Sequence, residues 1–172
     1  MIFDSHAHYD DKQFDKDRDE LLSSMNKNGV DFILNSGESL RASKAGVELG
    51  KKYDFIYSAS GIHPSNTKNM TEEIYNEIKE LTKNEKVVAI GEIGLDYHYD
   101  NTDKEKQRYW FKRQLEMAKE LSMPVIIHSR DAAQECFDII KESGVNKGII
   151  HCYSGSPEMA AAYVKLGFYI GI

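Results

Sequence analysis

The sequence is poor in residues that cross-link, rigidify or anchor a chain. Its 172 residues include two cysteines, three prolines and one tryptophan. Two cysteines, Cys136 and Cys152, are too few for the disulfide framework of a small secreted domain, so we expect free thiols and a cytoplasmic location. No apolar run approaches the roughly 20 residues that a membrane-spanning helix needs, and we expect no membrane partner. The N-terminus lacks the basic segment and apolar core of a signal peptide.

Positive charge and glycine-rich loops are also scarce. The net charge of −6 argues against broad, nonspecific binding to nucleic acid. It leaves a phosphodiester substrate open, because bound divalent cations would reverse the local field. Neither G-x-G-x-x-G nor G-x-x-x-x-G-K-[ST] occurs, so the phosphate-binding loop typical of an open doubly wound sheet is not predicted.

Short apolar runs rich in β-branched residues recur along the chain, and most lack strict polar alternation. Strands that are buried on both faces of a parallel sheet have this pattern. The predicted strands are Ile2–Asp4, Asp31–Asn35, Phe55–Ser60, Val87–Ile90, Pro124–Ile127, Gly148–Ile150 and Phe168–Ile172. Helices are predicted between them: one around Leu21 to Met25 that ends at Gly29, and others that begin after Thr71, Asp103, Asp131 and Ser156, the last two ending at Gly144 and Gly167.

Repeated strand-and-helix units predict a parallel sheet with right-handed crossovers. Polar residues at the ends of several strands favour a (β/α)₈ TIM barrel over an open sheet. A complete barrel takes about 250 residues. We therefore expect residues 1–172 to form one domain that is truncated after about seven strands and incomplete at its C-terminus.

Five of the six histidines and one carboxylate follow these apolar runs. They are His6, His8, His63, His128 and His151, together with Glu92. Imidazole and carboxylate are the usual ligands of catalytic divalent metals. Because the carboxyl ends of parallel strands meet at one end of a barrel, these side chains are predicted to converge on a metal site. Alternation along an extended segment points His6 and His8 the same way.

Each of these residues also has a plainer explanation. An isolated His-x-His is as often two unrelated polar residues at a strand end. His128 or His151 taken alone is more often a hydrogen-bonded core histidine than a ligand. Burying Glu92 is costly unless it binds a cation or accepts hydrogen bonds. Bridging two metals is its natural role, and an N-cap or an ion pair is the alternative. The shared position of all these residues favours ligation.

Two residues beside the predicted ligands favour substrate contacts. His63 precedes Pro64, which places it at the rim, so contact with a substrate phosphate or proton transfer is favoured over ligation. Arg130 can clamp an anionic oxygen bidentately, and a surface salt bridge to Asp131 or Glu135 is equally supported.

Three further residues lie close to the predicted ligands in the sequence. Asp96 is predicted to position a ligand histidine or a substrate group. Tyr153 either touches substrate or packs. His98 is better explained as a loop residue.

Several motifs together resemble the TatD family of metal-dependent deoxyribonucleases, which belongs to the amidohydrolase-like superfamily. They are D-S-H-A-H-Y-D, G-I-H-P, A-I-G-E-I-G-L-D-Y, P-V-I-I-H-S-R, I-I-H-C-Y-S-G and G-F-Y-I-G-I. The resemblance implies a (β/α)₈ barrel with two divalent metals, one on His6 and His8, the other on His128 and His151, and Glu92 bridging them. It makes His63 a substrate contact. It also implies an essential aspartate after an eighth strand, which this sequence does not include.

The predicted function is hydrolysis of DNA phosphodiester bonds by a metal-bound hydroxide. Glu92, His63 and Arg130 are the predicted catalytic residues, and His63, Arg130, Asp96 and Tyr153 are the predicted substrate contacts. The metals are expected to be Zn²⁺, Mn²⁺, Ni²⁺ or Mg²⁺. Related barrels that hydrolyse amides often carry a bridging lysine where Glu92 stands, which favours the nuclease. The alternatives are an amidohydrolase acting on a small amide or phosphoester, and an inactive metal-binding fragment.

Overall fold

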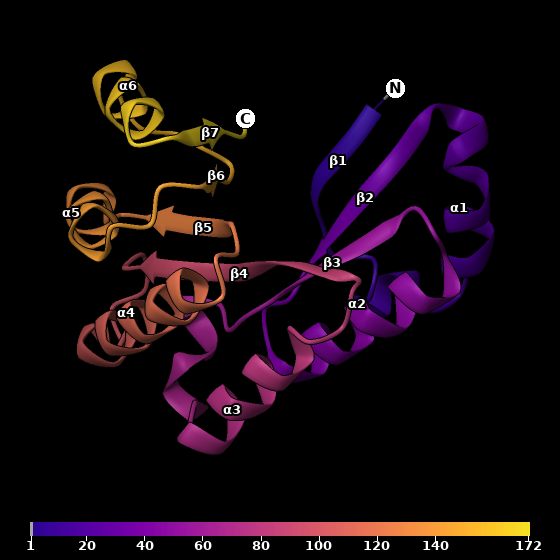
Figure 1. Ribbon diagram of the computed structural model, residues 1–172, viewed down its shortest axis with the longest axis horizontal. Coiled ribbons are helices and arrows are strands. Elements are labelled where there is room, and N and C mark those ends of the chain that lie inside the picture. Colours follow the sequence, from indigo (N-terminus) through magenta and orange to yellow (C-terminus); the bar gives the residue numbers. More distant parts are fainter. Residues whose placement is uncertain (1) are drawn as a thin grey trace.

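The computed structural model describes residues 2–172 and contains one parallel sheet whose seven strands follow the order of the chain. The strands are β1 (Ile2–Ala7), β2 (Val30–Ser36), β3 (Ile56–Ser60), β4 (Val87–Asp96), β5 (Val125–Arg130), β6 (Gly148–Ile150) and β7 (Phe168–Ile170). The sheet curls so that β1 and β7 form its two free edges (Figure 1). A curled parallel sheet with helical crossovers is of the TIM-barrel type, as the sequence predicts.

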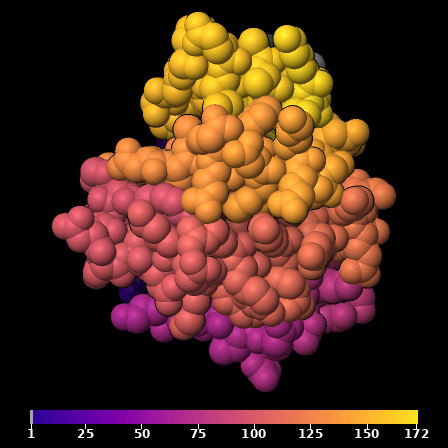
Figure 2. Space-filling view, turned by 90° about the vertical axis from the view of Figure 1, so that its left-hand side faces the viewer, coloured from indigo at the N-terminus to yellow at the C-terminus, as the bar shows by residue number. Residues whose placement is uncertain are grey.

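The helices cover the outer, convex side of the sheet (Figure 1). They are α1 (Arg18–Ser24), α2 (Leu40–Lys52), α3 (Glu72–Leu81), α4 (Lys104–Glu120), α5 (Ala133–Ser143) and α6 (Pro157–Lys165), with short 3₁₀ turns η1 (Lys12–Phe14), η2 (Asn26–Asn28) and η3 (Pro64–Asn69). Figure 2 shows the outer surface of the second half, where the segments stack in chain order. None of the helices in residues 2–172 is long and apolar enough to cross a membrane.

Most predicted helix boundaries are confirmed. Thr71, Asp103 and Ser156 each accept a hydrogen bond from a backbone N–H of the helix that they begin. The helix predicted after Asp131 is α5, which ends at Gly144 as predicted, but Asp131 does not cap it. Ala132 occupies the cap position, and the Asp131 carboxylate lies instead 3.0 Å from Nδ1 of His98. A partner on a neighbouring loop therefore competes with the helix for this carboxylate.

The helix signals in the sequence do not include α2. Two glycines inside it, Gly46 and Gly50, lower its intrinsic helix propensity. The structure gives the reason for Gly46: a Cβ at this position would overlap the Ser58 hydroxyl of β3. Helix α2 forms because it packs closely on the sheet, a tertiary contact that local propensity does not report.

Strand β4 is longer than predicted and continues from Ile90 to Asp96. Glu92 therefore lies inside a strand rather than at its end. The extension is possible because Gly94, with φ of +148°, pairs with His128 of β5 so closely that a Cβ would overlap its carbonyl group. Close approach of β4 and β5 brings Glu92 and His128 into one site.

The main core lies between the sheet and the outer helices and includes Ile93, Phe111 and Ile140. The inner face of the sheet is different. It leaves an apolar hollow of about 490 Å³ whose lining includes Phe3 of β1, Val88 of β4 and Tyr169 of β7. The described strands thus bury their outer side chains well and leave part of the inner layer uncovered.

Candidate active site

Glu92 occupies the centre of the histidine cluster and is only 4% exposed. Its Oε2 lies 3.1 Å from His6 Nε2 and 3.6 Å from His8 Nε2. Its Oε1 lies 3.1 Å from His128 Nδ1 and 3.9 Å from His63 Nε2. Two groups of converging ligand atoms result, one on each carboxylate oxygen, and either could hold a metal ion. Glu92 is common to both groups, and each of its carboxylate oxygens faces one of them.

The curled sheet brings these residues together from four separate strands or strand ends. His6 lies in β1 and His8 just after it, and their Nε2 atoms are 3.0 Å apart. They share a side of the extended segment, as alternation predicts. His63 follows β3, and His128 lies within β5. Parallel strands in chain order thus convert residues far apart in the sequence into one cluster.

Three of the four histidines have a second partner that fixes the ring. His6 Nδ1 lies 3.2 Å from the Ser36 hydroxyl, and His128 Nε2 lies 3.1 Å from Oδ2 of Asp96. His63 Nδ1 lies 2.7 Å from the Ser65 hydroxyl. Such outer partners hold a ligand histidine in one tautomer and orientation. The site is therefore oriented by protein groups.

The sequence predicts that Asp96 positions a ligand histidine or a substrate group, but it does not point to Ser36 or Ser65 as partners of the rings. Ser36 is the last residue of β2, and Ser65 stands two residues after His63. A small polar residue at a strand end is the signal that could have identified Ser36. Serines are common in loops, so Ser65 carried no comparable signal.

The buried charge of Glu92 dominates the electrostatics. Burial acts to raise the pKa of Glu92, but hydrogen bonds from His128, His6 and His8 outweigh it and hold that pKa far below its usual range. The hydrogen bond to Glu92 raises the pKa of His8. Burial acts to lower the pKa of His128, yet Glu92 and Asp96 raise it on balance. The carboxylate is thus ionised at the centre of the cluster, as a cation-binding group must be.

His63 and His151 are neutral at neutral pH. Burial lowers the pKa of each to about 4. The Ser65 backbone N–H donates to Nδ1 of His63 at 3.2 Å, which makes Nδ1 the acceptor and leaves the ring hydrogen on Nε2. In this tautomer His63 offers a donor toward the cluster, which fits the predicted substrate contact better than ligation.

His151 contacts the histidine cluster through the face of its ring rather than through a ring nitrogen. The ring stacks on His6 with centroids 3.4 Å apart and planes 10° from parallel. Its nitrogens are outside both groups of converging ligand atoms among the described residues. The structure thus brings His151 to the site, while the second group contains His63 in its place.

The remaining predicted site residues lie around this cluster. Asp96 is buried and contacts His128, as its predicted positioning role requires. Arg130 is exposed at the end of β5, with its guanidinium carbon 6.0 Å from the centre of the Tyr99 ring. The Tyr153 hydroxyl donates to the Ser156 carbonyl at 2.6 Å. Tyr153 and His151 both line a cavity of about 260 Å³ at this end of the sheet.

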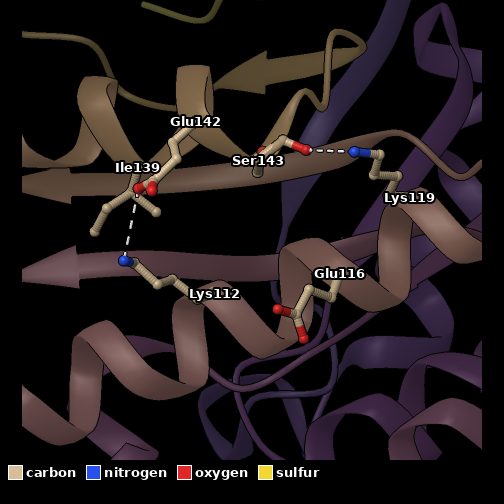
Figure 3. Close-up of a pocket in the computed structure, with 6 residues that line it drawn as sticks. All are labelled: Lys112, Glu116, Lys119, Ile139, Glu142 and Ser143. Atoms are coloured by element: carbon tan, nitrogen blue, oxygen red, sulfur yellow. Dashed lines mark hydrogen bonds and ion pairs between the residues drawn. The ribbon is translucent and has the colours of Figure 1, made fainter.

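A second hollow lies away from these residues, between α4 and α5. It has a volume of about 410 Å³, and Lys112, Glu116 and Glu142 are among its lining residues (Figure 3). Lys112 pairs with Glu142 at 3.6 Å, and Lys119 donates to the Ser143 carbonyl at 2.9 Å. These are ordinary contacts between helix surfaces, so the groove offers nothing comparable to the histidine cluster.

Comparison with known proteins yields a consistent set of relatives. The family model described as TatD related DNase matches residues 3–172. A metal-dependent hydrolase of Bacillus subtilis, YabD, is 43% identical over 99% of this chain and 68% of its own length. The 3'-5' ssDNA/RNA exonuclease TatD of Shigella flexneri is 36% identical over 99% of this chain and 66% of its own length.

Solved structures agree with the sequence matches. YjjV, a TatD homologue from Escherichia coli K12, superimposes with a TM-score of 0.94 at 30% identity, covering 99% of this chain and 67% of the other. The chain therefore spans about two thirds of the length of the relatives that it matches.

Proposed function

Because the chain belongs to the TatD related DNase family, as its motifs predict, we propose that it binds two divalent metal ions and hydrolyses phosphodiester bonds of nucleic acid. The observation that carries this proposal is the division of Glu92 between two groups of histidines. A buried carboxylate with one oxygen toward each group is suited to bridging two cations. Relatives named as a metal-dependent hydrolase and as an ssDNA/RNA exonuclease support the same reaction class.

The donor set fits divalent metals. His6, His8 and one oxygen of Glu92 would hold one cation, and the other oxygen with His128 would hold the second. Imidazole-rich ligation favours Zn²⁺, Mn²⁺ or Ni²⁺, with Mg²⁺ as the more oxygen-seeking alternative. His151 is proposed as a further ligand of the second cation, and ligation requires its ring to leave the stack with His6.

When bound, the cations would acidify a water molecule and neutralise charge on the phosphate. The chain's own residues orient and bind. His63 donates its Nε2 hydrogen to a phosphate oxygen, a role that its bond from the Ser65 backbone supports. Arg130 binds a phosphate oxygen from the rim. Asp96 holds the His128 ring through Nε2. We propose Tyr153 as a substrate contact beside His151.

The two cysteine thiols support a proposal for the cellular setting. Cys136 and Cys152 are both free in the structure. Free thiols of this kind fit the reducing cytosol, where we propose that the protein acts.

The proposal is tested by metal content and cleavage together. Purified protein is loaded with Mn²⁺ or Zn²⁺, its bound metal is measured by mass spectrometry, and end-labelled single-stranded DNA is offered as substrate. Wild-type protein should bind two equivalents and cleave the strand. His128→Ala should lose one equivalent, because the second group loses a ligand. Glu92→Gln should lose both equivalents, since the bridging charge is gone.

Glu142→Gln is the matched control, because it removes a carboxylate from the α4–α5 surface without touching the cluster. It should retain metal and cleavage. Unchanged metal content in Glu92→Gln would contradict the bridging role. Full metal content without cleavage of DNA, a small phosphoester or an amide would instead support the inactive metal-binding fragment, and cleavage of the amide alone would support the amidohydrolase.

A further inference from the structure

The loop that follows β4 carries an exposed aromatic ring. Tyr99 is 57% exposed, and no hydrogen bond from another described residue reaches its hydroxyl. Three positions earlier, Asp96 contacts His128 of the cluster. The other large aromatic side chains that the structure exposes lie within strands or on α4. Tyr99 is therefore distinguished by its place on a loop that leaves the site.

The segment that carries Tyr99 is held at several points. The Tyr97 backbone N–H donates to the Arg130 carbonyl at 2.9 Å, and the Tyr97 hydroxyl donates to Glu135 at 2.8 Å. His98 is tied to Asp131 at 3.0 Å, and the Thr102 N–H donates to the Tyr99 carbonyl at 3.1 Å. An aromatic ring on a fixed loop binds a flat ligand at a low cost in conformational entropy.

Arg130 gives this ring a charged neighbour. Its guanidinium carbon lies 6.0 Å from the centre of the Tyr99 ring, within the range of a cation–π contact. Arg130 is also two residues beyond His128 and pairs with Asp96 in the sheet register. Alternation along β5 puts the Arg130 side chain on the same side of the strand as His128, and its guanidinium is near the exposed ring. It is therefore suited to bind a phosphate next to the scissile one.

The charges around Tyr99 and Arg130 indicate that the two residues would bind different kinds of group. Asp100 is exposed beside Tyr99 and disfavours an anion there, but it does not oppose a neutral, flat group. The Asp131 carboxylate, next to Arg130 in the sequence, contacts Nδ1 of His98 at 3.0 Å. Because it is held by His98, it repels a phosphate at Arg130 less. The arrangement therefore fits a phosphate at Arg130 followed by a neutral ring on Tyr99. A nucleotide of single-stranded nucleic acid supplies both groups in this order.

We propose that Tyr99 is a stacking platform for an unpaired nucleobase next to the cleaved bond, with Arg130 holding the intervening phosphate. This inference rests on the proposed phosphodiesterase function and names a base-binding subsite for it. Bases stack on aromatic side chains without much sequence preference. The platform would make the enzyme select strands with unpaired bases, since a paired base cannot lie on the ring.

The test compares binding of two single strands to the metal-loaded protein by fluorescence anisotropy. One is a short oligodeoxynucleotide with phosphorothioate linkages, which resist cleavage, and the other has the same backbone without bases. Tyr99→Ala should weaken binding of the base-bearing strand about tenfold, the order expected for one stacked base. Tyr99→Phe should bind like wild type, because the aromatic face remains. Tyr99→Ala and wild type should bind the strand without bases with equal affinity.

Tyr109→Ala is the matched control. Tyr109 is 50% exposed and has the Arg113 guanidinium carbon 5.7 Å from its ring centre, but it lies on α4 and its hydroxyl donates to Glu72. This variant should bind both strands like wild type. The stacking role would be overturned if Tyr99→Ala bound the base-bearing strand as tightly as wild type does. It would also be overturned if Tyr99→Ala lost the same affinity for both strands. If wild type neither binds nor cleaves any strand, the proposed function itself is wrong.

Discussion

At the residue scale, the site depends on how the charge of Glu92 is compensated. Each of its oxygens faces its own pair of imidazoles, and the side chain is almost completely buried. An ionised carboxylate in such a position is costly unless a cation or hydrogen-bond donors compensate it. The raised pKa values of His8 and His128 show the histidines supplying that compensation. Divalent cations would supply more charge at the same place.

The same reasoning supports Asp96 as the proposed positioning residue of His128. Its Oδ2 lies 3.1 Å from Nε2 of His128, on the side of the ring opposite Glu92. We expect Asp96→Asn to weaken metal binding about 10- to 100-fold, because outer partners of ligand histidines have effects of this size. Titration calorimetry with Zn²⁺ or Mn²⁺ measures the change. Asp138→Asn on α5, whose carboxylate bonds only to Gln134 among the described residues, is the control, and equal affinities in both variants would contradict the role.

At the scale of elements, the sequence predicts strand positions better than strand lengths. Apolar runs locate all seven strands, because strands that pack on a core require apolar residues whatever the neighbouring strands are. The end of β4 was not predictable in this way. It continues to Asp96 because Gly94 allows close pairing with β5, which is a tertiary contact. Local sequence signals do not indicate α2 for a related reason, since its glycines serve its packing on the sheet.

The candidate site was also predictable only in part, in residue types but not in their contacts. A ligand type at a strand end is visible in the sequence, so the histidines and Glu92 could be identified as a set. Which nitrogens converge depends on ring orientation, which is set by partners such as Ser36 and Ser65. Sequence patterns do not specify these contacts. Hence the stack of His151 on His6, and the entry of His63 into the second group, appeared only in the structure.

Gly94 and Gly29 allow the packing of β4 on β5 to be tested. Both have positive φ, but a Cβ at Gly94 would overlap the His128 backbone, whereas a Cβ at Gly29 would meet nothing within 4 Å. Gly29→Ala should therefore lower the free energy of unfolding by about 1–2 kcal/mol, the cost of a left-handed alanine. Gly94→Ala should cost clearly more and should also reduce metal binding, because His128 must shift. Urea unfolding measures the stabilities, and equal losses would contradict the close pairing.

At the scale of the whole molecule, the inner layer of the sheet is the part least covered. Strands β1 and β7 are edges of the described sheet, and apolar side chains line the hollow between them. Phe3 is 55% exposed and Tyr169 is 74% exposed. Unpaired strand edges beside exposed apolar surface favour pairing with another chain. The helical outer face, by contrast, carries many ion pairs, such as Lys79 with Glu120.

We therefore expect the 172-residue chain to self-associate through its open inner face. Sedimentation velocity should show a mean mass that rises with protein concentration. Replacing both Phe3 and Tyr169 by lysine should suppress this rise, because charge is added to both sides of the apolar hollow at positions too exposed to support the core. Val164→Lys changes an exposed apolar residue on α6 instead and should leave association unchanged. A wild-type chain that stays monomeric at every concentration would contradict self-association through the inner face.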